Sequence, residues 1–204
     1  MEPQEFTERQ TRILDRAEEL FFRKGFRRVT ADEIADALGI SKKTLYQDFR
    51  GKSELVRAVV RRKMAQLKAT LTRHLETSDA AQTSGSERRS GDVAPLMGHF
   101  RLLAGELRSL GSEFLSDVMK YDGELWAEVN AFRREHIFTR LQRRIEEEQV
   151  AGTVRRDVSP RIVTTMLIAF AENLLTPENV VALDITPSAM VEQIGSIVIR
   201  GIST

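Results

Sequence analysis

The chain of 204 residues has no cysteine, few turn-forming residues and no long apolar run. The absence of cysteine excludes disulfides, thiolate metal ligands and a cysteine nucleophile. With only 12 glycines and 5 prolines, the composition favours long helices over a turn-rich β fold. Because no run of 18 apolar residues is present, we expect no transmembrane helix. Nothing in the first residues resembles a signal peptide, so we expect a cytoplasmic protein with no membrane partner.

Common catalytic and metal-binding motifs are also missing. The sequence contains no GxSxG, HExxH, GxGxxG or P-loop motif. Its histidines, His74, His99 and His136, do not have the i, i+4 spacing of a helical metal site. We therefore expect that the protein is not an enzyme and that it holds no cofactor and no metal.

The formal net charge of +1 conceals a strong asymmetry along the chain. Residues 1–73 carry 17 Lys and Arg against 11 Asp and Glu, whereas residues 74–204 carry 14 against 19. Most of the excess lies in residues 41–63, which carry 8 basic and 2 acidic side chains. This segment is either a surface that binds a polyanion or a solvated helix face, and charge alone does not separate the two.

Apolar residues recur at spacings of three, four and seven, so an all-α fold of about nine helices is predicted. No stretch has the period-two pattern of a strand. The predicted helices are 6–24, 30–38, 41–48, 52–76, 95–110, 114–119, 124–148, 160–175 and 187–202. Residues 77–92 contain no apolar side chain larger than alanine, which predicts a flexible linker.

Residues 30–55 have the spacing of a helix-turn-helix followed by a long basic helix. Thr30 and Glu33 form the pattern of a capping box, and Gly39 stands where a left-handed residue would end the first short helix. Ser41 is a good N-cap for the second short helix. In this motif the second helix enters the major groove. We therefore expect residues 1–51 to bind DNA and residues 52–204 to form a second domain.

This segment resembles the signature of the tetracycline-repressor (TetR) family of bacterial transcriptional regulators. The resemblance covers about residues 8–60. The matching residues are Thr30-Ala-Asp-Glu-Ile-Ala35, Leu38-Gly-Ile-Ser-Lys-Lys-Thr-Leu-Tyr46, Phe49 and Lys52-Ser-Glu-Leu55. It implies an all-α homodimer with an N-terminal three-helix DNA-binding domain and a C-terminal helical domain for ligand binding and dimerisation. It also implies a regulator, most often a repressor, that leaves a palindromic operator when a small effector binds.

The resemblance assigns DNA-binding roles to residues of the helix-turn-helix. The counterparts of Thr30, Tyr46 and Lys52 contact phosphate in that family, and those of the second helix face the bases. The predicted DNA-binding residues are Thr30, Ser41, Lys42, Lys43, Thr44, Tyr46, Gln47 and Lys52. One residue departs from the family pattern, because Asp48 stands where the family often has His or Tyr. A carboxylate there would repel phosphate, so no DNA contact is expected from Asp48.

The C-terminal helices are predicted to dimerise and to hold a small lipophilic effector. The helices 160–175 and 187–202 carry more apolar surface than one internal partner would cover, with Gly195 and Ser196 allowing close approach of a neighbouring backbone. The predicted dimerisation residues are Ile168, Ile194 and Ile197. The predicted ligand-binding residues are Phe100, Leu103, Phe114, Trp126, Phe170 and Glu172. The alternative for the large aromatics is an ordinary core position.

A second function remains open at this point. The chain could be a helical small-molecule-binding protein whose N-terminal domain no longer binds operator DNA, and Asp48 is the residue that favours this alternative.

Overall fold

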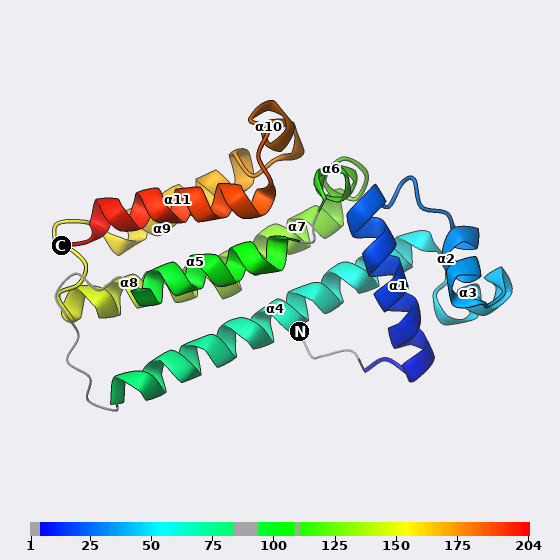
Figure 1. The fold of residues 1–204 in the computed structure, drawn as a ribbon, viewed down its shortest axis with the longest axis horizontal. Coiled ribbons are helices and arrows are strands. Elements are labelled where there is room, and N and C mark those ends of the chain that lie inside the picture. The colour runs from blue at the N-terminus through cyan, green and yellow to red at the C-terminus, as the bar shows by residue number, and fades with distance from the viewer. Residues whose placement is uncertain (1–4, 84–93, 109–110) are drawn as a thin grey trace. The chain divides into compact units, whose positions relative to one another are not determined.

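The computed structural model describes residues 5–83, 94–108 and 111–204, and confirms the predicted all-α fold. Within these ranges no strand occurs, although Val154 and Ser203 form an isolated antiparallel bridge. The helices, labelled in Figure 1, are α1 Glu8–Lys24, α2 Ala31–Leu38, α3 Lys42–Asp48, α4 Lys52–Thr83, α5 Ala94–Leu107, α6 Ser112–Tyr121, α7 Gly123–Phe132, η1 Arg133–Phe138, α8 Thr139–Val150, α9 Pro160–Asn173, α10 Pro177–Ala182 and α11 Pro187–Ile202. Among the described residues, no helix has both the length and the apolar character needed to cross a membrane.

The chain divides into two compact units. Unit 1 comprises residues 1–67 and 109–126, and unit 2 comprises residues 68–108 and 127–204. The helix α4 contributes to both units, and it extends to Thr83 rather than ending at residue 76 as predicted. The first seven residues of the predicted linker 77–92 are therefore helical, and its remainder lies outside the described residues. A functional division after residue 51 stays a prediction.

Unit 1 is built on short helices whose ends are set by local side chains. The Thr7 hydroxyl accepts from the backbone N–H of Gln10 and completes a capping box at the start of α1. The three helices α1, α2 and α3 then bury an apolar core. Its largest fully buried members are Ile13, Leu14, Leu20, Phe21, Ile34 and Leu45, together with Leu55 from the start of α4. Burial of this face, rather than intrinsic propensity, stabilises helices as short as α2 and α3.

The helix α6 packs against the end of α1 inside the same unit. The ring of Phe114 lies 4.8 Å from the ring of Phe22 and 6.5 Å from that of Phe26. The Asp117 carboxylate accepts from the backbone N–H of Arg27 at 2.8 Å. Residues 109–126 thus belong to the same compact body as the helix-turn-helix, which the sequence did not predict.

In unit 2 the helices α5 and α11 lie side by side along most of their length (Figure 1). A Cβ atom added at Gly195 would lie 2.5 Å from the ring of Phe100. We expect from the sequence that Gly195 allows close approach of a neighbouring backbone, and the neighbour found there is α5 of the same chain, through Phe100. The close approach of α5 to α11 requires glycine at this position.

Two elements of unit 2 differ from the predicted helices. The predicted helix 124–148 is continuous but passes through a π-helical turn, η1, between α7 and α8. The short helix α10 was not predicted, although Thr176 and Pro177 repeat the Thr-Pro start of α11. In both helices the threonine hydroxyl caps the N-terminus and proline occupies the first turn.

Candidate nucleic-acid interface

The turn between α2 and α3 has the tight geometry of a helix-turn-helix. Gly39 adopts a left-handed conformation with φ 66° and ψ 29°, as predicted. The N–H of Ile40 then donates to the carbonyl of Ala35 at 3.0 Å, which ends α2. The Ser41 side chain accepts from the N–H of Thr44 at 3.0 Å and starts α3. The predicted caps at Gly39 and Ser41 are therefore confirmed.

The outward face of α3 is polar and cationic. The side chain of Leu45 is buried, whereas Lys42, Lys43, Tyr46 and Gln47 are exposed. At the N-terminus of the helix, Ser41 is exposed and Thr44 is half-buried, with their hydroxyls 2.8 Å apart. Lysine and glutamine can donate to base edges in the major groove. The structure thus brings these predicted residues together on one surface of one short helix.

One of these cations is already paired within the chain. The Lys42 ammonium donates to the carboxylate of Asp32 on α2 at 2.8 Å. This hydrogen bond and the charge of Asp32 raise the pKa of Lys42. Both groups are exposed, so the pair is of the kind that exchanges readily for another partner. Lys42 can reach an anion by leaving Asp32.

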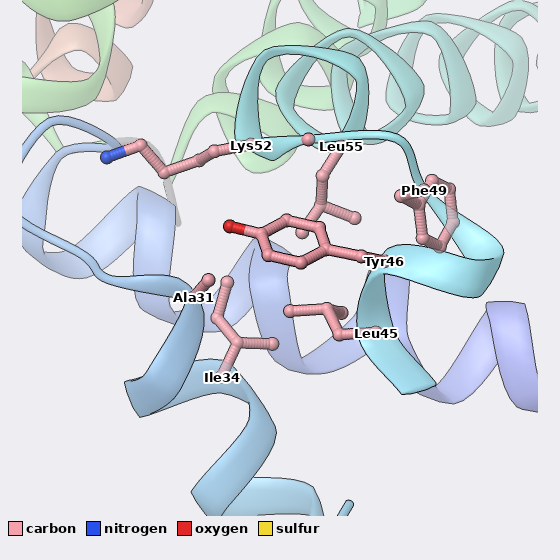
Figure 2. Close-up of a pocket in the computed structure, with 8 residues that line it drawn as sticks. Ala31, Ile34, Leu45, Tyr46, Phe49, Lys52 and Leu55 are labelled. Atoms are coloured by element: carbon pink, nitrogen blue, oxygen red, sulfur yellow. The ribbon is translucent and has the colours of Figure 1, made fainter. Parts of the chain in front are cut away.

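Tyr46 lies beside Lys52 at a small pocket (Figure 2). The pocket is lined by Ala31, Ile34, Leu45, Tyr46, Phe49, Gly51, Lys52 and Leu55. The Tyr46 ring packs on these apolar neighbours, and its hydroxyl points toward the side where Ala31 lies. With 42% of its surface exposed, Tyr46 is both a packing residue and an accessible donor.

Lys52 closes the connection between α1 and α2. Its ammonium donates to the carbonyl of Val29 at 3.0 Å and to that of Arg27 at 3.3 Å. Partial burial, followed by the charge of Arg27, lowers the pKa of Lys52. An ammonium has three donors, so one remains for an external acceptor such as phosphate.

Thr30 caps α2, but the predicted capping box forms only in part. The Thr30 hydroxyl accepts from the N–H of Glu33 at 3.1 Å. The Glu33 carboxylate instead accepts from the ammonium of Lys24, and this contact lowers the pKa of Glu33. Thr30 remains exposed at the N-terminus of α2, where free N–H groups favour an anion.

Asp48, the residue expected to repel phosphate, has a partner that the sequence did not reveal. The Arg9 guanidinium on α1 donates through Nε at 2.6 Å and through Nη2 at 3.0 Å to the two oxygens of the carboxylate. Only 8% of the Asp48 side chain is exposed. Arg9 was missed because 39 positions separate the two residues, and no local pattern indicates such a pair.

The predicted effector residues do not share one unit. Phe114 and Trp126 belong to unit 1, and Phe114 is buried against Phe22. The other four belong to unit 2, where Phe100, Leu103 and Phe170 are part of, or pack against, one apolar cluster. The half-buried Glu172 carboxylate accepts from the guanidinium of Arg134.

The predicted dimerisation residues differ in exposure. Ile168 and Ile194 are half-buried, and Ile194 packs against the core of its own chain. Ile197 on α11 is 66% exposed. Ile162 and Met166 on α9 are exposed apolar side chains as well. The two helices therefore carry apolar surface that their own unit leaves uncovered.

Comparison with known proteins agrees with this geometry. The model of the tetR family of bacterial regulatory proteins matches residues 13–59. The chain is 25% identical over 195 residues to the HTH-type transcriptional regulator YvaF of Bacillus subtilis (strain 168), covering 94% of each chain. It is also 39% identical over 71 residues to the HTH-type transcriptional activator FasR of Mycolicibacterium smegmatis, covering 35% of this chain and 32% of that one.

Solved structures share the fold along nearly the whole chain. A transcriptional regulator from Cytophaga hutchinsonii superposes with a TM-score of 0.68 at 16% identity, covering 97% of this chain and 100% of that one. The regulator FadR from Bacillus subtilis, in complex with stearoyl-CoA, gives a TM-score of 0.62 at 17% identity, covering 94% and 98%. Residues 13–59, which contain the helix-turn-helix, therefore match the TetR family of bacterial regulators, and the chain shares its fold with transcriptional regulators along nearly its whole length.

Proposed function

We propose that this chain is a homodimeric repressor that reads a palindromic operator through α3 and is released by a small lipophilic effector. The observation that carries the proposal is the outward face of α3, where Lys42, Lys43, Tyr46 and Gln47 project from a helix anchored by a buried Leu45. DNA binding is assigned to residues 1–51, and effector binding and dimerisation to residues 52–204.

Roles within the interface follow from the chemistry of each side chain. Gln47 can pair with the N6 and N7 edge of adenine, and Lys43 can donate to guanine. Ser41, Lys42 and Thr44 lie at the N-terminal end of α3, the end that faces base edges in this motif. Thr30, Tyr46 and Lys52 offer one donor each to the sugar-phosphate backbone.

The dimer is supported by the exposed apolar side chains of α9 and α11. Ile162, Met166 and Ile197 form no part of the core of their own unit, and a second copy of the same two helices would cover them. A twofold dimer presents two recognition helices, so its site has to be palindromic or nearly so. Ile168 and Ile194, which are half-buried on the same two helices, would extend this interface.

A lipophilic effector is supported by the apolar character of unit 2 around Phe100, Leu103 and Phe170. FadR of Bacillus subtilis, a structural neighbour, is bound to a lipophilic acyl-CoA. The effector must bind the DNA-free state more tightly, with a typical coupling of about 1–3 kcal/mol. A thermal-shift screen of acyl-CoAs and aromatic compounds, followed by DNA titration with each hit, tests this part.

The alternative of a binding protein without operator binding rested on the charge of Asp48. Since Arg9 neutralises that carboxylate, the charge no longer argues against DNA binding.

The deciding experiment is selection of bound fragments from a pool of random duplex DNA. We expect enrichment of a palindrome, and binding of the selected duplex in the nanomolar range with a steep dependence on salt. Failure to enrich any sequence, with no salt-dependent binding, would refute the proposal.

Three variants then separate base contacts from phosphate contacts. Gln47→Ala should change base preference at one position in each half-site, whereas Lys52→Ala should weaken all duplexes alike and reduce the salt slope. The Lys52 ammonium also donates to the Val29 carbonyl, so its removal can lower stability. The melting temperature of the Lys52→Ala variant is therefore measured together with its affinity for DNA. Arg143→Ala is the matched control, since Arg143 is an exposed cation of α8 in unit 2. A change of base preference in Lys52→Ala with an unchanged slope would reverse these assignments.

A further inference from the structure

We infer that Arg9 is an additional phosphate-binding residue of the DNA interface and that Asp48 is the residue that positions it. The inference rests on the proposed DNA-binding function, but on a different observation, the two-point pair between α1 and the end of α3. Arg9 lies in the first turn of α1, and Asp48 is the last residue of α3.

The geometry of the pair fixes the orientation of the guanidinium. Its Nε and Nη2 atoms reach the two carboxylate oxygens at 2.6 and 3.0 Å, so both planar groups are held edge to edge. Two-point contacts of this kind restrict orientation as well as distance. The short side chain of Asp48, almost fully buried, cannot move far, and Arg9 is therefore held against the end of α3.

The pair leaves most of the donors of Arg9 free to act outward. A guanidinium has five N–H groups, and the contact with Asp48 uses one on Nε and one on Nη2. Of the remaining three, one is on Nη2 and two are on Nη1, so the Nη1–Nη2 edge of the group can still donate. Within the pair, 57% of the Arg9 side chain is exposed, whereas only 8% of the Asp48 side chain is exposed. An approaching phosphate therefore meets the guanidinium before it meets the carboxylate.

The position of the pair places this edge beside the candidate DNA surface. Asp48 follows directly after Gln47, and Tyr46 is exposed on the same helix. A helix that lies in the major groove has phosphates beside both of its ends, and planar guanidinium groups bind phosphate through two parallel bonds. The acidic residue that departs from the family pattern thus acts by presenting a cation.

A carboxylate that only repels DNA is the competing explanation, and the two explanations differ in the sign of one effect. If the carboxylate merely repels DNA, Asp48→Asn should bind DNA more tightly than the wild type. If the carboxylate positions Arg9, Asp48→Asn should bind several-fold more weakly, although it removes a negative charge.

The experiment measures the affinity of the full-length chain for two duplexes of equal length across a series of salt concentrations. One duplex is selected by the wild type from a random pool, and the other is unrelated in sequence. Arg9→Ala should weaken both about equally and lower the salt slope by about 0.9, the value of one lost phosphate contact. Arg9→Lys should keep the salt slope but lower the affinity for DNA, because an ammonium retains the positive charge but cannot form the two parallel bonds of a guanidinium. The double variant Arg9→Ala, Asp48→Asn should bind no more weakly than Arg9→Ala.

The matched control is Arg23→Ala, which removes an exposed and paired arginine from the other end of α1. It should keep the wild-type slope. Melting temperatures of all variants separate DNA contact from loss of fold, since a brace would lower stability without changing the slope. Tighter binding by Asp48→Asn, or an unchanged slope in Arg9→Ala, would overturn the inference while leaving the proposed function intact. Absence of binding by the wild type to either duplex would refute the proposed function itself.

Discussion

The two units expose different kinds of large apolar side chain. In the described part of unit 1, the exposed ones are two tyrosines, Tyr46 and Tyr121. In the described part of unit 2 they are all aliphatic or methionine: Val150, Ile162, Met166, Leu174, Val181, Leu183 and Ile197. A phenol can donate to a polar partner such as a nucleic acid, whereas an aliphatic side chain gains only when another apolar surface covers it. The exposed large side chains of unit 1 therefore suit a polar partner, and those of unit 2 suit an apolar one.

The units also differ in where they keep their charges. In unit 1 the side chains of Asp48 and Arg62 are almost buried, but each pairs with an exposed partner, Arg9 in one case and Asp15 at 2.7 Å in the other. Unit 2 buries several polar groups, including His99 and an ion pair of Arg144 with Glu148 at 3.1 Å. An exposed charge can exchange its partner at little cost in free energy, whereas a buried charge destabilises the fold when its partner is lost. Unit 1 is thus suited to meeting an ionic ligand, and unit 2 is sensitive to changes of its own protonation.

The largest expected effect comes from placing a charge on the aliphatic surface of unit 2. If α11 dimerises, Ile197→Glu buries an unpaired carboxylate, which costs about 3–5 kcal/mol. The dimer should then dissociate at least about a hundredfold more readily, as measured by sedimentation velocity. Val150→Glu is the control, because Val150 is 81% exposed on α8 and belongs to neither α9 nor α11. Equal dimerisation of both variants would remove α11 from the interface.

The buried histidine of unit 2 should make stability depend on pH. Burial, followed by the charges of His74, Arg140 and Arg144, lowers the pKa of His99 to about 4 from an ordinary value of 6.5. Between these values the unfolded chain binds a proton that the folded chain does not, so stability falls as the pH drops from 6.5 toward 4. The loss amounts to about 1.4 kcal/mol per pH unit and to about 3 kcal/mol in total.

Urea unfolding at pH 7.5, 6 and 5 measures this dependence. His99→Leu removes the titrating group and the Nε2 atom that is buried without a hydrogen-bond partner. Its stability should change less between pH 7.5 and 5 than that of the wild type, by about 2 kcal/mol. The same pH slope in both proteins would mean that His99 is accessible to protons in the folded state.

A smaller effect tests the packing of α5 against α11. Gly195→Ala places a methyl group 2.5 Å from the Phe100 ring and should destabilise the fold by about 1–3 kcal/mol. Gly105→Ala, at a helical position of α5 with no atom within 4 Å of the added methyl, should stabilise the fold by up to about 1 kcal/mol. Thermal unfolding of the two variants should therefore shift in opposite directions. If both variants instead shift the unfolding temperature upward, α5 and α11 can move apart without a loss of stability.

The sequence was informative about unit 1 because its motif is local. The roles of Gly39 and Ser41 follow from neighbours within a few positions, and so does the cap at Thr30. The partner of Asp48 could not be predicted, because the pair depends on how α1 packs on α3 rather than on any spacing. The start of α10 was present as Thr176-Pro177 but was overlooked in a helix of only six residues.

In unit 2, the spacing of apolar residues predicts the helices but not the contacts between them. The contact of Gly195 with Phe100 spans two helices far apart in the sequence, and periodicity does not say which helix faces which. The sequence predicts more apolar surface on 160–175 and 187–202 than one internal partner would cover, and Ile162 and Met166 are exposed within the chain. Periodicity separates apolar from polar faces, but it cannot say whether an apolar face meets its own chain or another.

The smallest expected effect concerns a threonine N-cap that occurs in both units. The Thr30 hydroxyl accepts from Glu33 N–H at 3.1 Å in unit 1, and the Thr186 hydroxyl accepts from Ala189 N–H at 3.2 Å in unit 2. Thr30→Ala and Thr186→Ala should each cost about 1 kcal/mol of stability, because each leaves one helix-end N–H without its acceptor. Only Thr30→Ala should also weaken DNA binding, by a few-fold and with a smaller salt slope, since only Thr30 lies beside the candidate DNA surface. Thr30→Ser, which keeps the hydroxyl, should restore both properties. If the two alanine variants bind the selected duplex equally well, Thr30 caps α2 and makes no contact with DNA.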